Sequence, residues 1–146
     1  PSFVKRKDGA IVAFMRENGL TRKIRTAVSP DNGMTWGKVE SLDIPNPGSS
    51  VECIPLKNGH WVLVCNDTTN GRHLLTVYLS DDEGVTWKWK RALENAEKDT
   101  GSFSYPSVIQ AADGAIHCTY SHSISGEKGS SIKHARFNEE WIREGK

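Results

Sequence analysis

The chain has 146 residues, a formal net charge of +1 and 25% charged residues. This length suits one domain with a real core, and the scattered basic residues argue against nucleic acid as a partner. No apolar run approaches the ~18 residues of a membrane span, so we expect no membrane partner. No signal segment opens the chain, and the compartment is left undetermined, with secretion or the periplasm as options if a signal peptide has been lost.

The first third of the chain reads as four short strands joined by turns. We expect strands at residues 2–7, 10–16, 23–29 and 34–40. Asp8-Gly9 lies between the first two apolar runs, and Asp-Gly in that setting is a strong hairpin signal. The last two strands flank residues 29–36, SPDNGMTW, which are rich in turn residues.

The same order of strands follows twice more. The second set is expected at residues 51–56, 61–66, 73–80 and 85–91, and the third at residues 105–110, 115–121, 131–137 and 140–143. The polar stretches 91–101 and 123–130 are expected to be loops. The fold class predicted is therefore all-β, with three four-stranded antiparallel units at about residues 1–45, 46–100 and 101–146.

One eight-residue pattern occurs twice, as SPDNGMTW at residues 29–36 and SDDEGVTW at residues 80–87. Both copies read Ser-x-Asp-x-Gly-x-Thr-Trp. Ser and Asp side chains can bond nearby backbone N–H groups, and Gly supplies a positive-φ corner. We expect the Thr-Trp pair to start a strand whose indole packs inward.

Two sets of markers give one period. Gly9, Gly59 and Gly114, each after Asp or Asn, are spaced by 50 and 55 residues. Trp36, Trp87 and Trp141 are spaced by 51 and 54 residues. A period near fifty built from strands alone is typical of β-propeller blades.

The repeated pattern resembles the Asp box of sialidase-like propellers, the BNR or Asp-box repeat family. The resemblance covers nearly the whole chain and looks like the C-terminal half of a six-bladed enzyme. It implies that the three units are blades of a β-propeller and that the box itself is structural.

Strand direction predicts where polar residues gather. In an antiparallel sheet the hairpin turns and the Asp boxes fall on one side, while the starts of the first and third strands and the end of the second fall on the other. Ligands bind at the blade rims around a propeller's channel. The second rim is expected to carry Arg16, Glu17, Asn66, Asp67, Arg72, Tyr105 and residues 120–122.

The resemblance implies roles for three of these residues. In sialidases, arginines from several blades clamp the sugar carboxylate and a tyrosine is the nucleophile. Arg16 and Arg72 stand where two clamp arginines are found, and Tyr105 matches the nucleophile. The plain alternatives are ordinary surface arginines and a tyrosine that packs on an inner strand.

The family also uses an assisting glutamate and an acid/base aspartate. The position expected for the glutamate falls one residue before Pro1, and the aspartate would lie further upstream. Glu52 is the nearest internal candidate for a spare carboxylate, and Glu17 is another. Asp67 and His122 complete the expected substrate-binding rim.

The resemblance therefore implies a sialidase-like exo-glycoside hydrolase, or a piece of one, acting on a carboxylated sugar such as sialic acid. One alternative is a noncatalytic Asp-box module that binds glycan or protein. The other is a related propeller lyase or rhamnosidase that uses His73 or His122. The partner expected in the enzyme reading is a carbohydrate.

No cofactor or metal site is expected, because His117 and His122 are five apart on a strand and face opposite sides. Cys53, Cys65 and Cys118 are expected to be free thiols, with Cys65 opposite Glu52 across the second hairpin. Three blades cannot close a ring and would leave two apolar faces open. We expect either a fragment of a longer ring or a homodimer that completes a six-bladed one.

Overall fold

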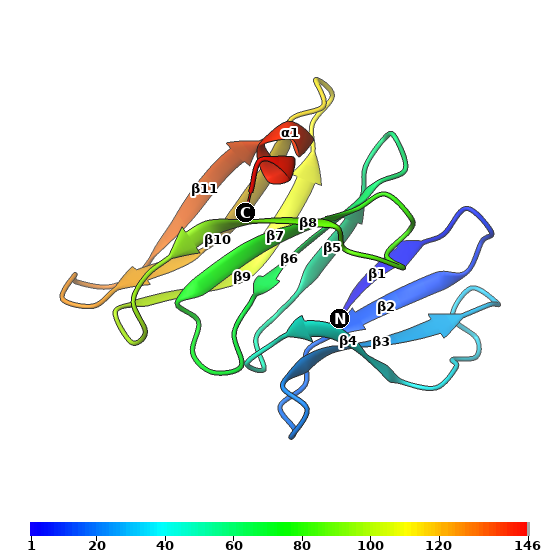
Figure 1. Cartoon of the computed structure of the whole chain (residues 1–146), viewed down its shortest axis with the longest axis horizontal. Coiled ribbons are helices and arrows are strands. Elements are labelled where there is room, and N and C mark those ends of the chain that lie inside the picture. Colours follow the sequence, from blue (N-terminus) through cyan, green and yellow to red (C-terminus); the bar gives the residue numbers. More distant parts are fainter. Residues whose placement is uncertain (146) are drawn as a thin grey trace.

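The computed structural model describes residues 1–145, which form three antiparallel sheets arranged in a row (Figure 1). The first sheet contains β1 (Ser2–Lys5), β2 (Ile11–Met15), β3 (Lys23–Ser29) and β4 (Glu40–Pro45). The second contains β5 (Glu52–Pro55), β6 (Trp61–Asn66), β7 (Leu74–Ser80) and β8 (Trp89–Asn95). The third contains β9 (Gly101–Gln110), β10 (Ile116–Ile124) and β11 (Ser131–Phe137), followed by helix α1 (Glu139–Arg143).

The first strands of successive sheets are neighbours. β1 contacts β5, and β5 contacts β9. Ser2 Oγ donates to the Cys53 carbonyl at 3.0 Å and accepts from the Cys53 N–H at 2.9 Å, which ties β1 to β5. This arrangement confirms the all-β fold of consecutive propeller blades.

The apolar residues form two cores, one in each space between sheets. Phe14, Ile24 and Trp61 belong to the core between the first and second sheets. Tyr120 and Ile142 belong to the core that joins the second sheet, the third sheet and α1. Among residues 1–145, no helix is long and apolar enough to cross a membrane.

Both Asp boxes fold into the same hydrogen-bonded loop. In the second box Ser80 Oγ accepts from Gly84 N–H at 2.9 Å and donates to Asp82 Oδ1 at 2.8 Å. Asp82 also accepts from the backbone N–H and the hydroxyl of Thr86, at 2.8 and 2.5 Å. The first box repeats these contacts with Ser29, Asp31, Gly33 and Thr35. The shared sequence pattern is thus a shared set of hydrogen bonds, as predicted.

The prediction for the strands after the boxes was wrong in position. β4 begins at Glu40 and β8 at Trp89, several residues later than expected, because the Asp side chain holds the Thr residue inside the loop. Trp36 is 43% exposed and contacts Phe3, so its indole does not pack inward. Trp87 is half-buried against Phe14. β8 also takes up residues 91–95, which were expected to be a loop.

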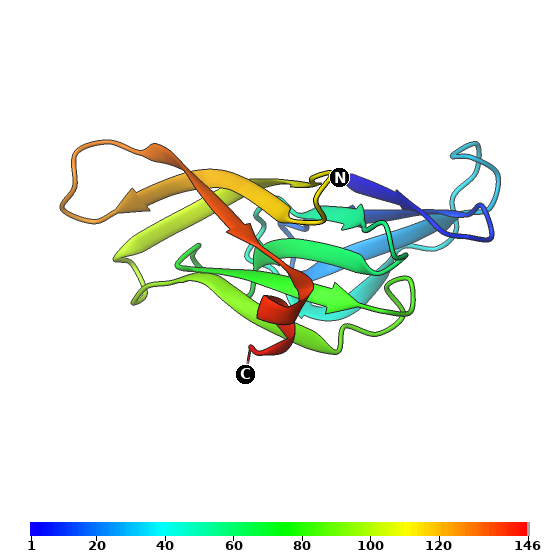
Figure 2. The same cartoon turned by 90° about the horizontal axis from the view of Figure 1, so that it is seen from above.

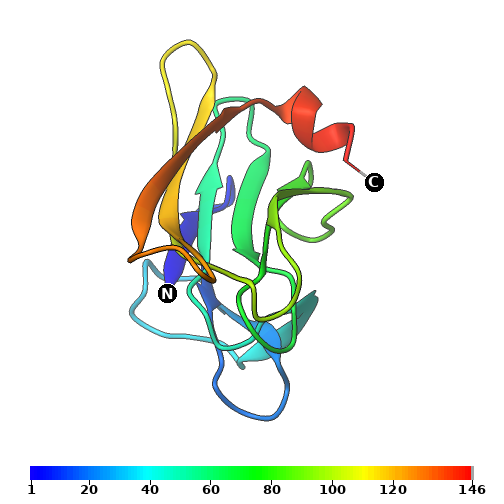
Figure 3. The same ribbon diagram turned by 90° about the vertical axis from the view of Figure 1, so that its left-hand side faces the viewer.

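The fourth strand expected at residues 140–143 is instead helix α1, so the third sheet has three strands. Asn138 caps this helix by accepting from the Trp141 N–H at 2.9 Å. After β11 the chain leaves the third sheet, and α1 packs against β7 and β8 of the second (Figures 2 and 3). The helix buries Ile142 in the core that the second and third sheets share.

The three cysteines are free and buried, as expected. The expected register of the second hairpin was one residue off, because Glu52 pairs with Val64 and Cys53 with Leu63. Burial raises the pKa of all three thiols, so they are ordinary core residues.

Candidate functional site

The candidate site lies at the sheet rim predicted from strand direction. Arg16 directly follows β2, Arg72 lies two residues before β7, and Tyr105 lies within β9. These three residues come from three different sheets. The fold gathers at one place side chains that are 33 or more positions apart in sequence.

Tyr105 sits on a β-bulge. Thr119 pairs with Ser107 and Ser121 with Ser104, so Tyr105 and Pro106 together oppose Tyr120. The φ angle of Tyr105 is 54°, a left-handed conformation that a residue before proline rarely adopts. Bulges of this kind redirect a side chain at a sheet edge and are frequent beside functional sites. Here the bulge leaves Tyr105 57% exposed.

Arg72 and Arg16 both act on the Tyr105 phenol. The Arg72 guanidinium Cζ lies 5.5 Å from the centroid of the Tyr105 ring. Hydrogen bonding and the positive charge of Arg72, and then of Arg16, lower the pKa of Tyr105 below its ordinary value. A nearby cation favours the phenolate, so this phenol is easier to deprotonate than a free one. The structure thus brings together the three residues that the family resemblance singled out.

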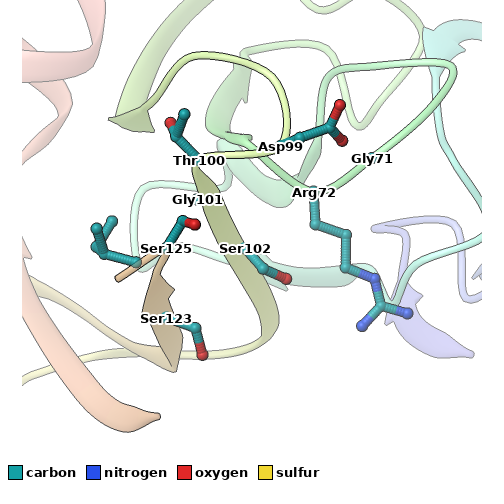
Figure 4. A pocket seen from close by; sticks show the side chains of 9 residues that line it. Gly71, Arg72, Asp99, Thr100, Gly101, Ser102, Ser123 and Ser125 are labelled. Carbon is teal, nitrogen blue, oxygen red and sulfur yellow. The ribbon is translucent and has the colours of Figure 1, made fainter. Parts of the chain in front are cut away.

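A cleft of about 450 Å³ opens beside Arg72. Its walls are the loop before β7, the turn that leads into β9 and the end of β10 (Figure 4). Besides Arg72, the side chains that line it carry one carboxylate, four hydroxyls and one aliphatic group: Asp99, Thr100, Ser102, Ser123, Ser125 and Ile124. Such groups can exchange hydrogen bonds with the hydroxyls of a sugar.

This cleft was not predicted from the sequence. Residues 91–101 were expected to be a loop, whereas β9 begins at Gly101. Ser102 pairs with Ser123 across β9 and β10, so the two hydroxyl side chains share one face. The serine residues near the start of β9 and the end of β10 were the sequence feature that could have indicated this cleft.

Glu17 and Asp67 interact with residues outside the group of Arg16, Arg72 and Tyr105. Glu17 accepts from the Thr21 hydroxyl and lies 3.8 Å from Arg25. Asp67 forms an ion pair with Lys90 at 2.8 Å. Neither carboxylate has a hydrogen bond or ion pair with Arg16, Arg72 or Tyr105 among residues 1–145.

Glu52 is the first residue of β5, and His122 lies near the end of β10. Burial raises the pKa of Glu52, while the Pro1 amino group partly offsets that effect. His122 packs beside Phe103 with ring centroids 5.1 Å apart. His117 instead stacks on His134, with Nδ1 and Nε2 2.9 Å apart. Within residues 1–145, no group of three or more His, Cys, Asp or Glu residues is placed to hold a metal ion.

Residues 1–118 match the family described as "BNR repeat-like domain". The chain belongs to this family. The match spans the first two blades and strand β9 of the third, so it includes Arg16, Arg72 and Tyr105.

Individual relatives of this BNR chain are sialidases. It is 26% identical over 149 residues to a sialidase of Micromonospora viridifaciens, covering 95% of the chain and 21% of the relative. Its fold is similar to the intramolecular trans-sialidase of Ruminococcus gnavus in complex with oseltamivir carboxylate, with a TM-score of 0.81 and 21% identity, over 97% of the chain and 32% of that structure. It is also similar to a mutant of the NanB sialidase of Streptococcus pneumoniae, with a TM-score of 0.73 and 23% identity, over 94% of the chain and 23% of that structure. The chain thus spans only a fifth to a third of the length of these relatives.

Proposed function

We propose that this chain carries the anion-binding rim of a sialidase-like exo-glycoside hydrolase that acts on a carboxylated sugar such as sialic acid. The observation that carries the proposal is the convergence of Arg16 and Arg72, from two sheets, on the phenol of Tyr105. The likeness to sialidases supports the sugar class.

The residue types suit a sugar carboxylate. Arginine stays charged and forks a carboxylate through two N–H groups, and each hydrogen bond to a charged group contributes about 1.5–3 kcal/mol net. A neutral tyrosine avoids the repulsion that a carboxylate nucleophile would suffer, ~4 kcal/mol for unit charges at 4 Å and an effective dielectric of 20. Sialidases depart from the two-carboxylate scheme of other glycosidases by using a tyrosine nucleophile.

The reaction assigned to Tyr105 has a defined proton balance. The phenol oxygen bonds to the anomeric carbon as the glycosidic C–O bond breaks, a carboxylate takes the phenol proton, and an acid protonates the leaving oxygen. Among residues 1–145 no carboxylate is hydrogen-bonded to Tyr105, on which only Arg72 and Arg16 act. In this proposal the chain supplies the arginines that bind the sugar carboxylate and the tyrosine nucleophile. Glu52 is the candidate within the chain for the carboxylate that takes the phenol proton.

Calorimetric titration tests the proposal. N-acetylneuraminic acid should bind the chain, and its methyl ester, which lacks the charge, should bind at least roughly tenfold more weakly because the charge-assisted bonds are lost. Arg72→Gln should remove this difference. Arg136→Gln is the matched control, because Arg136 pairs with Asp113 at the opposite, hairpin side of the third sheet. Equal binding of acid and ester by the unmodified chain would contradict the proposal.

A noncatalytic module that binds acidic glycans is the second candidate. It is favoured by the lack, within the described residues 1–145, of a carboxylate bonded to Tyr105. The two candidates differ in turnover. Release of the aryl group from an aryl α-sialoside, abolished by Tyr105→Phe, would support the enzyme. Binding without release would favour the module.

A further inference from the structure

The buried amide of Asn66 links the two halves of the candidate site. Asn66 is the last residue of β6 and is fully buried. Its Nδ2 atom lies 2.9 Å from the Phe103 carbonyl, 3.0 Å from the Leu74 carbonyl and 3.3 Å from the Arg72 carbonyl. A carboxamide NH₂ has two hydrogens, so the two shorter contacts are the main bonds and Arg72 shares one of them.

These bonds cross from one sheet to the next. Leu74 and Arg72 belong to the second sheet and its entering loop, whereas Phe103 belongs to β9 of the third. The Phe103 N–H also donates to the Arg72 carbonyl at 2.9 Å. The backbone of Arg72 is therefore fixed to β9 two residues before Tyr105.

We propose that Asn66 is a positioning residue that holds the Arg72 guanidinium over the Tyr105 ring. Arg72 lies near the end of a loop, residues 67–73, that is not part of any strand, so its backbone depends on contacts such as these. Tyr105 has a left-handed backbone, which persists only where the surrounding structure holds it. The Asn66 Nδ2 atom is bonded to both segments, whereas its Oδ1 is buried with no hydrogen-bond partner among residues 1–145. Because the Nδ2 bonds are buried, they restrict the movement of the two segments relative to each other.

This inference rests on the proposed function for the role of Arg16, Arg72 and Tyr105, but the contacts of Asn66 do not depend on that function. Its direct readout is the ionisation of Tyr105, which needs no sugar. The chain has three tyrosines, and burial raises the pKa of Tyr78 and Tyr120 while that of Tyr105 is lowered. The first phenol to ionise on raising the pH is therefore Tyr105, and Tyr105→Phe identifies its signal in ultraviolet absorbance.

The test is an ultraviolet pH titration of Asn66→Leu, which keeps the size and adds no charge, and of Asn66→Ala. Both should move the Tyr105 pKa upward, towards the ordinary value of about 10. They should also weaken the binding of N-acetylneuraminic acid roughly tenfold, which corresponds to the loss of about one hydrogen bond. In Arg72→Gln, adding Asn66→Leu should produce no further shift.

Asn46→Leu is the matched control. Asn46 is equally buried, but its Oδ1 accepts from the Gly48 N–H at 2.9 Å in the loop after β4. It should lower the melting temperature and leave the Tyr105 pKa in place. An unchanged Tyr105 pKa in folded Asn66→Leu, or an added shift in the Arg72→Gln background, would overturn the proposal.

The unmodified chain gives a second measurement if the Asn66 variants do not fold. The Asn66 carboxamide protons should exchange slowly with solvent and show NMR contacts to Phe103. Rapid exchange without those contacts would overturn the positioning role. A Tyr105 shift in Asn66→Leu without sugar binding in any form would instead leave that role intact and count against the proposed function.

Discussion

Arg72 and Tyr105 belong to different sheets, yet the Arg72 guanidinium Cζ lies 5.5 Å from the centroid of the Tyr105 ring. The contact places a fixed positive charge against an exposed phenol. It is the relationship on which the account of the site depends.

Replacing Arg72 should make Tyr105 harder to ionise. Arg72→Gln removes the cation that favours the phenolate, so the pKa of Tyr105 should rise. Arg16→Gln should raise it less, since the effect of Arg16 is the smaller of the two. Ultraviolet titration measures both, and a shift of equal size in Arg136→Gln would show that the effect comes from net charge alone.

The two box tryptophans should differ in their contribution to stability. Trp87→Ala should lower the free energy of unfolding by about 3 kcal/mol, because Trp87 packs edge-on against Phe14 in the core between sheets. Trp36→Ala should cost only about 1 kcal/mol, because Trp36 is 43% exposed and leaves a smaller cavity when it is truncated. Chemical denaturation measures both, and equal costs would mean that the second box does not dock on the first sheet.

Acid should loosen the second Asp box. Burial raises the pKa of Asp82, but hydrogen bonds from Thr86 and Ser80 outweigh it and lower the pKa to about 2. A carboxyl whose folded pKa is depressed stabilises the fold above its unfolded pKa of about 4 and loses that contribution as the pH falls towards 2. The melting temperature of Asp82→Asn should therefore be lower than that of the parent at pH 7, and the two should converge near pH 2. A constant difference across this range would contradict the assignment.

The box and the turns could be predicted from the sequence because each depends on neighbours in the chain. Ser80 and Asp82 bond to residues at most four positions away, so the pattern alone determines the loop. The start of β8 depends on where the loop releases the chain, which the pattern does not specify. The Trp141 spacing indicated a strand, but Asn138 and the acidic residues after it cap a helix.

The site was only partly predictable for a related reason. Strand direction places Arg16, Arg72 and Tyr105 on one rim, and the structure shows them together. Strand direction does not predict which charged group each side chain contacts. Glu17 and Asp67 were therefore assigned to the same rim, although they lie against Arg25 and Lys90. The left-handed backbone of Tyr105 goes against the preference of a residue before proline, and local sequence rules do not predict such conflicts.

The two end sheets leave large apolar side chains exposed. Phe3 and Met34 lie on the first sheet and its box loop, and Ile109 and Ile132 lie on the third sheet. If two copies complete a ring, the interface should bury more than ~2,000 Å². Light scattering should then report twice the mass of one chain, and replacing Ile109 and Ile132 with Asp should give a monomer. A well-folded monomer at low micromolar concentration would rule out the homodimer.

The most direct test of the carboxylate site is an NMR titration with N-acetylneuraminic acid that follows the side-chain signals of Arg16, Arg72 and Tyr105 together. All three signals should shift with a single dissociation constant, and the methyl ester should move none of them at the same concentrations. A response in only one arginine, or the same response to the ester, would contradict a shared carboxylate site at this rim.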